Sequence, residues 1–236
     1  MTKKHQTKIF CDSADFNEIK KLNNHHLVRG FTTNPSLMKK SGAKSYLEYS
    51  KKILKICKKK PISFEVISDN FTEIEKQAYK IHKWGKNVFV KIPVTNSKGK
   101  FSGKIIKKLS NQKLKLNITA VYTLDQVKKI IKCVNKKSDT IISIFAGRMA
   151  DAGKDPVPII KNSVNAVKKF KKIKILWAST REAYNYTEAI KCKCQIITMP
   201  PKIIYQISQF GKSFKVLTND TVKKFYKDAL EAKFKL

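Results

Sequence analysis

The sequence predicts an α/β protein that folds as a single-domain (β/α)8 TIM barrel across residues 1–236. Short apolar runs alternate with longer amphipathic stretches, and this alternation repeats eight times along the chain. The length of 236 residues is close to the roughly 250 residues typical of this barrel. An open doubly wound sheet is the alternative, but it would more often carry a G-x-G-x-x-G turn, which the sequence lacks.

The strand candidates are runs rich in Val, Ile and Phe. Most are apolar at consecutive positions, as expected of parallel strands that are covered on both faces of the sheet. In chain order they cover residues 8–11, 27–31, 62–67, 88–92, 115–118, 140–145, 173–177 and 195–198.

Amphipathic patterns follow each of these runs and predict helices. They cover residues 15–22, 45–57, 72–82, 102–109, 124–134, 156–170, 181–191 and 201–208, and a C-terminal helix is expected at about 220–234. Thr123 is expected to lie at an N-cap. No linker or low-complexity block interrupts the order, which favours one domain.

The chain is strongly basic, with 51 Lys and Arg against 17 Asp and Glu and a net charge of +34. The lysines spread over almost every predicted helix and no aromatic-interleaved basic strip stands out, so we expect solvated helix faces and no nucleic-acid partner. Affinity for polyanions is the alternative. Arg29, Arg148 and Arg181 are the only arginines, which makes them candidates for sites that need a planar, two-pronged cation.

Cysteine and histidine usage predicts neither disulfides nor a metal site. The five cysteines are odd in number and include no C-x-x-C pair, which indicates reduced core thiols. The four histidines have no metal-ligand spacing, so we expect no metal and no cofactor. No apolar run is long enough to span a membrane and the first residues do not resemble a signal peptide, so we expect a cytoplasmic protein.

A polar residue near the carboxyl end of a barrel strand is a candidate for chemistry, because active sites of barrels gather at that end. Lys91 lies within the apolar run NVFVKIPV. Enclosure there would lower the pKa of its ammonium group and let the neutral amine attack a carbonyl to form a Schiff base. The alternative is that Lys91 extends from the strand end into water.

Two acidic residues interrupt or end strand candidates in the same way. Glu65 in ISFEVIS is either a proton shuttle, a partner for Lys91, or half of a structural ion pair. Asp12 in KIFCDSAD is either a general base or the cap of the next helix. Asn117 and Thr119 end the fifth run and would by themselves be ordinary polar residues.

Two of the three arginines follow the sixth and seventh strand candidates. Arg148 lies in SIFAGRMAD and Arg181 in ILWASTRE. Ser179 and Thr180 are expected to cap the helix after the seventh strand, whose free N–H groups beside an arginine would suit phosphate. The alternative is that both arginines pair with surface carboxylates.

The segments GFTTNPSLM and FVKIP resemble the transaldolase family in the short form that includes fructose-6-phosphate aldolase. FCDSAD, SFEV, LNITAVY, SIFAGR and ASTR occur in the order expected for that family, and the resemblance covers residues 8–234. It implies a TIM barrel, a metal-free Schiff-base mechanism, sugar-phosphate substrates and a homo-oligomer.

The resemblance also implies roles for particular residues. Lys91 corresponds to the Schiff-base lysine, Asp12 to the carboxylate that handles the substrate hydroxyl proton, and Glu65 to the residue that acts through a water in carbinolamine dehydration. Substrate binding is implied for Asn34, Asn117, Thr119, Ser143, Arg148, Ser179 and Arg181. The last three of these correspond to a phosphate site, and Thr119 to a threonine beside the catalytic water.

Within the family, fructose-6-phosphate aldolases carry Gln at the position of Glu65 and Tyr at the position of Phe145, whereas this sequence resembles transaldolases at both. We therefore expect a transaldolase that transfers a dihydroxyacetone unit from sedoheptulose 7-phosphate or fructose 6-phosphate to an aldose phosphate. The alternatives are a fructose-6-phosphate aldolase that releases free dihydroxyacetone and a basic polyanion-binding protein on an inactive barrel.

Overall fold

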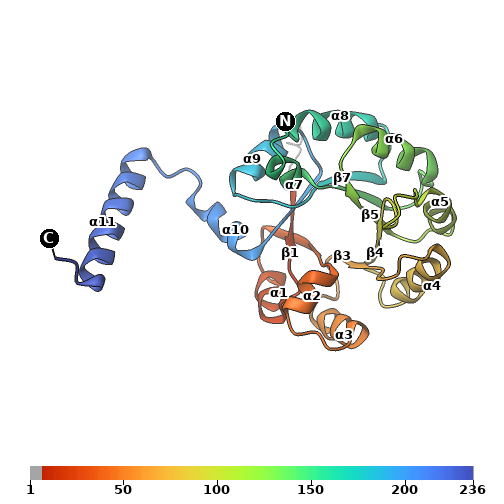
Figure 1. The fold of residues 1–236 in the computed structure, drawn as a ribbon, viewed down its shortest axis with the longest axis horizontal. Helices are drawn as coiled ribbons and strands as arrows, with labels where there is room; N and C mark the ends of the chain where they lie inside the picture. Colours follow the sequence, from red (N-terminus) through yellow and green to blue (C-terminus); the bar gives the residue numbers. More distant parts are fainter. Residues whose placement is uncertain (1–6, 236) are drawn as a thin grey trace. The chain divides into compact units, whose positions relative to one another are not determined.

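The computed structural model describes residues 7–235, and within them eight parallel strands close into a barrel. Each strand pairs with the next in the chain, and β1 pairs with β8 to complete the ring (Figure 1). All of the predicted runs form strands, so the predicted fold class is confirmed. The strands are β1 (Lys8–Asp12), β2 (Val28–Thr32), β3 (Ile62–Glu65), β4 (Val88–Pro93), β5 (Leu116–Val121), β6 (Thr140–Ile144), β7 (Ile173–Trp177) and β8 (Ile196–Met199).

Helices lie around the outside of the strands (Figure 1). The predicted ones are observed as α1 (Phe16–Asn23), α3 (Tyr46–Ile56), α4 (Phe71–His82), α5 (Gly103–Asn111), α6 (Leu124–Cys133), α8 (Val157–Val167), α9 (Tyr184–Lys191) and α10 (Pro201–Gln206). Two short helices, α2 (Pro35–Lys40) and α7 (Ala146–Asp151), were not predicted. With six residues each, these helices are too short to show a 3.6-residue pattern in the sequence.

Side-chain caps fix where several of these helices begin. Thr123 accepts a hydrogen bond from the backbone N–H of Gln126, whose side chain accepts in return from the backbone N–H of Thr123, so the expected cap is confirmed as a capping box. The cap of α1 is Asp15, which accepts from Glu18 N–H at 2.8 Å. Asp12 therefore does not cap α1, which removes the structural alternative for that carboxylate.

The expected cap of α9 is wrong. The helix begins at Tyr184 with Ala183 at its N-cap position, and no side chain caps it. Ser179 instead takes a left-handed conformation with φ of 65°, and the Thr180 hydroxyl donates to the carbonyl of Thr198 at 2.7 Å. The helix starts three residues too late for Thr180 to be its N-cap, and the hydrogen bond to Thr198 turns the Thr180 side chain toward β8.

All five cysteines fall within the described residues and are free thiols, four of them buried. Burial raises the pKa of the thiol in Cys57 and Cys194 to about 12. Across residues 7–235, no three His, Cys, Asp or Glu side chains converge as metal ligands would. None of the described helices combines the length and hydropathy needed to cross a membrane.

The chain divides into two compact units, the barrel up to Ile204 and a C-terminal unit that begins at Tyr205. The described part of the second unit contains the 3-10 helix η1 (Ile207–Gln209) and α11 (Phe214–Ala232). This long helix begins earlier than the expected start at residue 220, because Ser213 caps it by accepting from Val216 N–H. The parts of the expected barrel at residues 1–6 and 236 lie outside the described residues.

Candidate active site

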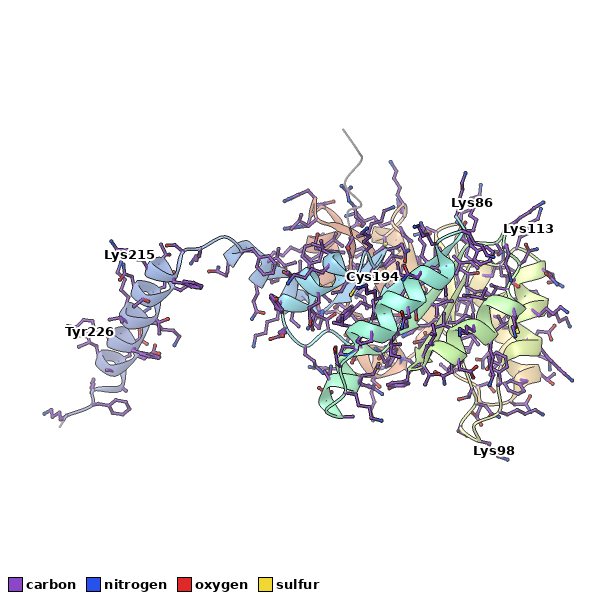
Figure 2. The ribbon with its side chains drawn as sticks, turned by 90° about the horizontal axis from the view of Figure 1, so that it is seen from above. Lys86, Lys98, Lys113, Cys194, Lys215 and Tyr226 are labelled. Carbon is purple, nitrogen blue, oxygen red and sulfur yellow. The ribbon has the colours of Figure 1, made fainter. Side chains whose placement is uncertain are left out.

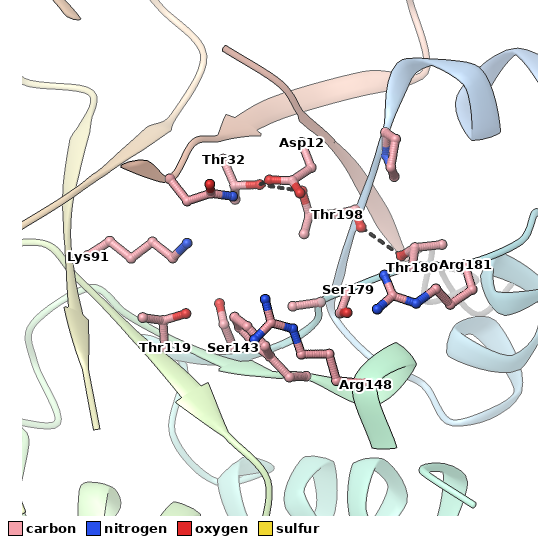
Figure 3. Close-up of a pocket in the computed structure, with 14 residues that line it drawn as sticks. Asp12, Thr32, Lys91, Thr119, Ser143, Arg148, Ser179, Thr180, Arg181 and Thr198 are labelled. Atoms are coloured by element: carbon pink, nitrogen blue, oxygen red, sulfur yellow. Dashed lines mark hydrogen bonds between the residues drawn. The ribbon is translucent and has the colours of Figure 1, made fainter. Parts of the chain in front are cut away.

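A cavity of about 170 Å³ opens at the carboxyl ends of the strands (Figure 3). Its walls come from β1, β2, β4, β5, β6 and β8, from α7, and from the loops after β2, β7 and β8. The sequence-predicted residues that line it are Asp12, Asn34, Lys91, Thr119, Ser143, Arg148, Ser179 and Arg181. The structure thus brings together most of the predicted site, at the end of the barrel where catalytic residues of this fold gather.

Lys91 on β4 is 6% exposed, so the alternative that it extends into water is wrong. Its Nζ lies 3.1 Å from Oε2 of Glu65 and donates to the carbonyl of Thr33 at 3.1 Å. The ion pair follows from the sheet register, which places Glu65 on β3 directly opposite Lys91. Glu65 is therefore the partner of Lys91, and the pair is oriented by two neighbouring strands.

Tyr46 on α3 fixes the strand end that carries Glu65. Its hydroxyl donates to the Glu65 carbonyl and accepts from the Glu65 N–H, both at 2.9 Å. These two bonds satisfy backbone groups where the β3 ladder ends. The sequence gives no signal for this role, because Tyr46 lies on a helix whose pattern predicts only packing against the sheet.

Asp12 lies at the end of β1 and lines the cavity. It accepts a hydrogen bond from the Thr32 hydroxyl at 2.7 Å, and the Thr32 and Thr198 hydroxyls lie 2.5 Å apart (Figure 3). Burial raises the pKa of Asp12, although the charge of Lys91 and the hydrogen bond from Thr32 oppose the shift. A carboxyl group with a raised pKa is suited to accept and return a proton near neutral pH.

Asn117 is the predicted binding residue that does not line the cavity. It is completely buried, donates to the Ser63 hydroxyl at 3.0 Å, and accepts from the Ser143 hydroxyl at 2.7 Å. The side chain that reaches the cavity is Ser143. Asn117 therefore orients Ser143 at the cavity, and the contact with substrate that the resemblance implies for Asn117 stays a prediction.

Thr119 carries a buried hydroxyl that has no hydrogen-bond partner among the described residues. The residue is 2% exposed and lines the cavity. Directly after it, Ala120 adopts φ of 58° and the pairing of β5 with β6 shifts register. Since buried hydroxyl groups are almost always satisfied in proteins, this one is positioned for a hydrogen bond to a ligand or water in the cavity.

Asn34 both lines the cavity and caps α2. Its carboxamide oxygen accepts from the backbone N–H of Leu37 at 2.9 Å. Pro35 follows at the first helical position, where its missing N–H costs nothing. The TTNPS motif is therefore a strand end joined to a capped turn that holds Asn34 at the pocket.

The two predicted phosphate-binding arginines differ in their surroundings. The guanidinium of Arg148 lies 5.2 Å from the ring centroid of Phe145. Arg181 pairs with Asp151, with Nη2 at 2.5 Å from Oδ2 and Nε at 3.0 Å from both carboxylate oxygens. The alternative of pairing with a surface carboxylate is thus observed for Arg181. Within residues 7–235, Arg148 has no such carboxylate partner.

A glycine brings the two arginine-bearing segments together. A Cβ atom on Gly147 would lie 1.6 Å from the Ser179 carbonyl oxygen, so only glycine permits this contact between α7 and the loop after β7. Arg148 follows Gly147, and Arg181 lies two residues beyond Ser179. Both arginines line the cavity, with Arg181 on the side opposite Lys91 (Figure 3).

Several residues of the site were missed by sequence reasoning. Thr32, Thr180 and Thr198 line the cavity and form the hydroxyl network beside Asp12. Thr198 could have been found, because it interrupts the apolar run QIITMP near a strand end just as Lys91 interrupts its own run. Thr32 lies in the same TTNPS motif as Asn34, but it was not predicted from the sequence as a site residue.

The fold and the cavity define a (β/α)8-barrel protein whose site is built around a buried, ion-paired lysine. The sequence model of the Transaldolase/Fructose-6-phosphate aldolase family matches residues 9–236. The chain belongs to this family, which confirms the resemblance noted in its motifs.

Similar proteins from two archaea carry the name probable transaldolase. The one from Nitrosopumilus maritimus is 32% identical over 225 residues, which cover 94% of each chain. The one from Thermoplasma volcanium is 34% identical over 214 residues, which cover 89% of this chain and 92% of the relative.

Among solved structures, dihydrodipicolinate synthase from Rhodopseudomonas palustris superimposes with a TM-score of 0.57. It is 11% identical and covers 97% of this chain and 81% of its own. At this level of identity the likeness supports the barrel fold alone.

Proposed function

We propose that the protein is a transaldolase, which transfers a dihydroxyacetone unit from a ketose phosphate to an aldose phosphate through a Schiff base on Lys91. The observation that carries the proposal is that Lys91 lines the cavity together with Asp12 and is ion-paired with Glu65, which does not itself line the cavity. A structural lysine does not need a second carboxyl group with a raised pKa across the same cavity. This intact arrangement is also the reason to prefer an enzyme over a polyanion-binding protein on an inactive barrel.

The first half of the reaction forms the iminium and breaks a carbon–carbon bond. Glu65 accepts a proton from the ammonium of Lys91, and the free amine attacks the ketone carbon of the donor. Glu65 then returns this proton to the hydroxyl group of the carbinolamine, which leaves as water and gives the iminium. Asp12 then takes the proton of the hydroxyl group on C4, the C3–C4 bond breaks, and its electrons move into the iminium to form an enamine. The aldose phosphate leaves.

The second half reverses these steps with another aldehyde. The enamine attacks the carbonyl carbon of the acceptor aldose phosphate, and Asp12 returns its proton to the new hydroxyl group. Water then hydrolyses the iminium and releases Lys91 and the product ketose. Because the dihydroxyacetone unit carries no phosphate, leaving and entering aldoses present their phosphate to the same place, for which Arg148 and Arg181 are the candidates.

The second candidate is a fructose-6-phosphate aldolase that releases free dihydroxyacetone. Phe145 favours the transaldolase, since it lines the cavity without a hydroxyl group that could protonate the enamine. With fructose 6-phosphate and erythrose 4-phosphate, we expect sedoheptulose 7-phosphate to form and little free dihydroxyacetone. Release of dihydroxyacetone at the same rate with and without the acceptor would instead assign the aldolase. No turnover of either kind would contradict the proposed function itself.

Arginine substitutions test the phosphate site. Arg148→Ala and Arg181→Ala should each raise KM for fructose 6-phosphate about ten-fold or more, because a charge-assisted hydrogen bond contributes about 1.5–3 kcal/mol. Steady-state kinetics with unphosphorylated fructose as donor provides the control, and there the variants should match the unsubstituted enzyme. An equal loss with both donors would show that the arginines support the fold and not the phosphate.

We also propose a homo-oligomer, for which the C-terminal unit gives support. The apolar residues Phe214, Leu217, Val222, Phe225, Tyr226 and Leu230 of α11 are not covered within the C-terminal unit itself. Apolar side chains that their own unit leaves uncovered need another surface to pack against, and we propose that a second copy of the chain supplies it. Light scattering after size-exclusion chromatography should give a multiple of 27.1 kDa, and the double variant Leu217→Glu/Phe225→Glu should lower this mass.

The matched control for the oligomer is Lys215→Glu/Lys223→Glu, which places two glutamates at the same spacing on polar positions of α11. It should keep the oligomeric mass. A monomeric mass for the unsubstituted protein, or an equal effect of both double variants, would contradict the proposal.

A further inference from the structure

A second cavity, of about 220 Å³, lies at the amino-terminal end of the barrel, the end opposite the candidate active site. In Figure 2, Lys86 and Lys113 mark the amino-terminal end of the barrel, because they precede β4 and β5. Lys98 follows β4 and marks the carboxyl end. Residues at this end of a barrel serve stability in most enzymes and not chemistry. A cavity at this end is therefore a candidate for ligand binding and not for catalysis.

The floor of this amino-end cavity is apolar and partly aromatic. Phe10, Ile141 and Ile196 line it and belong to one buried cluster, against which Phe89 packs. The Phe10 ring lies flat over Gly30, where an added Cβ atom would come within 2.6 Å of it. Such a floor suits a flat, apolar group of a ligand.

The rim of the same cavity is cationic. Lys8, Arg29, Lys172 and Lys174 line it with Asp139 as the one acidic lining residue. Asp139 is paired with Lys172 at 3.1 Å. The charged groups of Lys8, Arg29 and Lys174 have no ion pair or side-chain hydrogen bond to any part of the chain that the structure describes.

These cations also repel one another. Burial lowers the pKa of Lys174, and the positive charge of Lys8 lowers it further against the weaker opposing effect of Asp139. Lys60 precedes the lining residue Pro61, and burial lowers its pKa; Cys57 opposes this shift, and the charge of Arg29 adds a smaller lowering effect. Like charges that converge on a cleft create a field that attracts anions, and a bound anion would relieve their repulsion.

The position of these charges separates them from the general lysine excess. Most lysines of this chain lie on helices or in loops; solvent reaches Lys8 and Arg29 as well, and Lys174 is half-buried. Lys8, Arg29 and Lys174 lie instead on β1, β2 and β7, which fall within the four consecutive strands β7, β8, β1 and β2 of the closed barrel. The sheet itself therefore holds the three unpaired cations around one apolar floor.

We propose that the amino-end cavity binds a nucleoside polyphosphate, with the base on the apolar floor and the phosphates on Lys8, Arg29 and Lys174. An anion with several charges matches the three unpaired cations, and an aromatic base matches the floor of Phe10 and Phe89. The site is separate from the candidate active site, and the proposal does not depend on the reaction catalysed there.

The test is titration of the full-length protein with ATP at physiological ionic strength, followed by calorimetry. We expect saturable binding, and we expect Lys8→Gln/Lys174→Gln to weaken it about ten-fold or more through the loss of two charge-assisted contacts. The control Lys51→Gln/Lys55→Gln removes the same charge from the exposed face of α3 and should leave the affinity unchanged. Arg29→Gln, measured separately, should weaken binding as well, and circular dichroism checks that each variant is folded.

Several outcomes would overturn the proposal. The absence of saturable ATP binding would contradict the proposal directly. An equal loss of affinity in Lys8→Gln/Lys174→Gln and in the control Lys51→Gln/Lys55→Gln would show that ATP binds to diffuse positive charge. Tripolyphosphate that binds as tightly as ATP would show that the apolar floor takes no part. Displacement of ATP by fructose 6-phosphate would place the nucleotide in the other mouth of the barrel. A protein that binds single-stranded RNA but not ATP, with the same RNA affinity in the unsubstituted form and in Lys8→Gln/Lys174→Gln, would have a nucleic-acid surface instead of the proposed site.

Discussion

Lys91→Met should reduce turnover of fructose 6-phosphate by about four orders of magnitude or more, because removal of a covalent nucleophile eliminates the reaction path rather than one contact. The structure leaves no obvious substitute, since Lys91 is the lysine that lines the carboxyl-end cavity. Coupled spectrophotometric assays with both sugar phosphates measure the loss. Methionine has a similar length and fills the space of the buried side chain.

Loss of charge must be separated from loss of the nucleophile, because Lys91→Met also leaves Glu65 without its partner. A buried carboxylate without a partner is costly and reduces the stability of the fold. Lys91→Arg keeps a cation beside Glu65, but its guanidinium does not become a neutral nucleophile at physiological pH. We expect Lys91→Arg to fold and to be as inactive as Lys91→Met. Appreciable turnover by folded Lys91→Arg would contradict the nucleophilic role.

Asp12→Asn should lower kcat by about two to four orders of magnitude, the usual contribution of a general acid–base group. The asparagine oxygen can still accept the hydrogen bond from Thr32, so the geometry around it should persist. Lys91 forms the Schiff base, and Asp12 acts only in the later cleavage step. The Asp12→Asn variant should therefore still form the adduct with the donor sugar but fail to break its C3–C4 bond. Single-turnover measurements separate these two steps.

The pH dependence gives a second test of Asp12. The carboxylate must be ionised to accept the hydroxyl proton, and burial raises its pKa. The rate of cleavage should therefore fall as pH decreases through a value above the usual range for aspartate, and Asp12→Asn should lose this acidic limb. Because a raised pKa also means that ionised Asp12 costs folding free energy, Asp12→Asn should melt no lower than the unsubstituted protein at neutral pH.

Asp15→Asn is the matched control for Asp12→Asn. It makes the same chemical change three residues away, at a position that caps α1, and asparagine caps helices as well as aspartate does. Turnover should be unchanged. If Asp15→Asn lost activity to the same degree, or if Asp12→Asn kept the full rate, Asp12 would not be the proton acceptor.

Much of the site could be predicted because polar residues inside apolar strand patterns are conspicuous. Lys91, Glu65 and Asp12 each interrupt or end such a run, and closure of the barrel brings the ends of separate strands to one mouth. The pairing of Glu65 with Lys91 then depends on the register of β3 and β4. The sequence pattern allowed this pairing but left the alternatives open, since register is a property of the assembled sheet.

Residues that act through loops and through other side chains could not be predicted. The bond between Arg181 and Asp151 joins segments that no periodic pattern relates. The hydrogen bond by which Asn117 holds Ser143 at the cavity joins two strands and has no signal in either run. The Thr180 hydroxyl was expected at a helix cap, but it donates to the carbonyl of Thr198 on β8, and α9 begins only at Tyr184. In each case the deciding partner is distant in sequence.

The most direct test of the central claim is reduction with sodium borohydride in the presence of fructose 6-phosphate, followed by digestion with trypsin and mass spectrometry. The account predicts that the added mass lies on Lys91, which also blocks tryptic cleavage after that residue, and that Lys91→Arg acquires none. Modification of another lysine in its place, or an unmodified Lys91 after complete reduction with active enzyme, would contradict it.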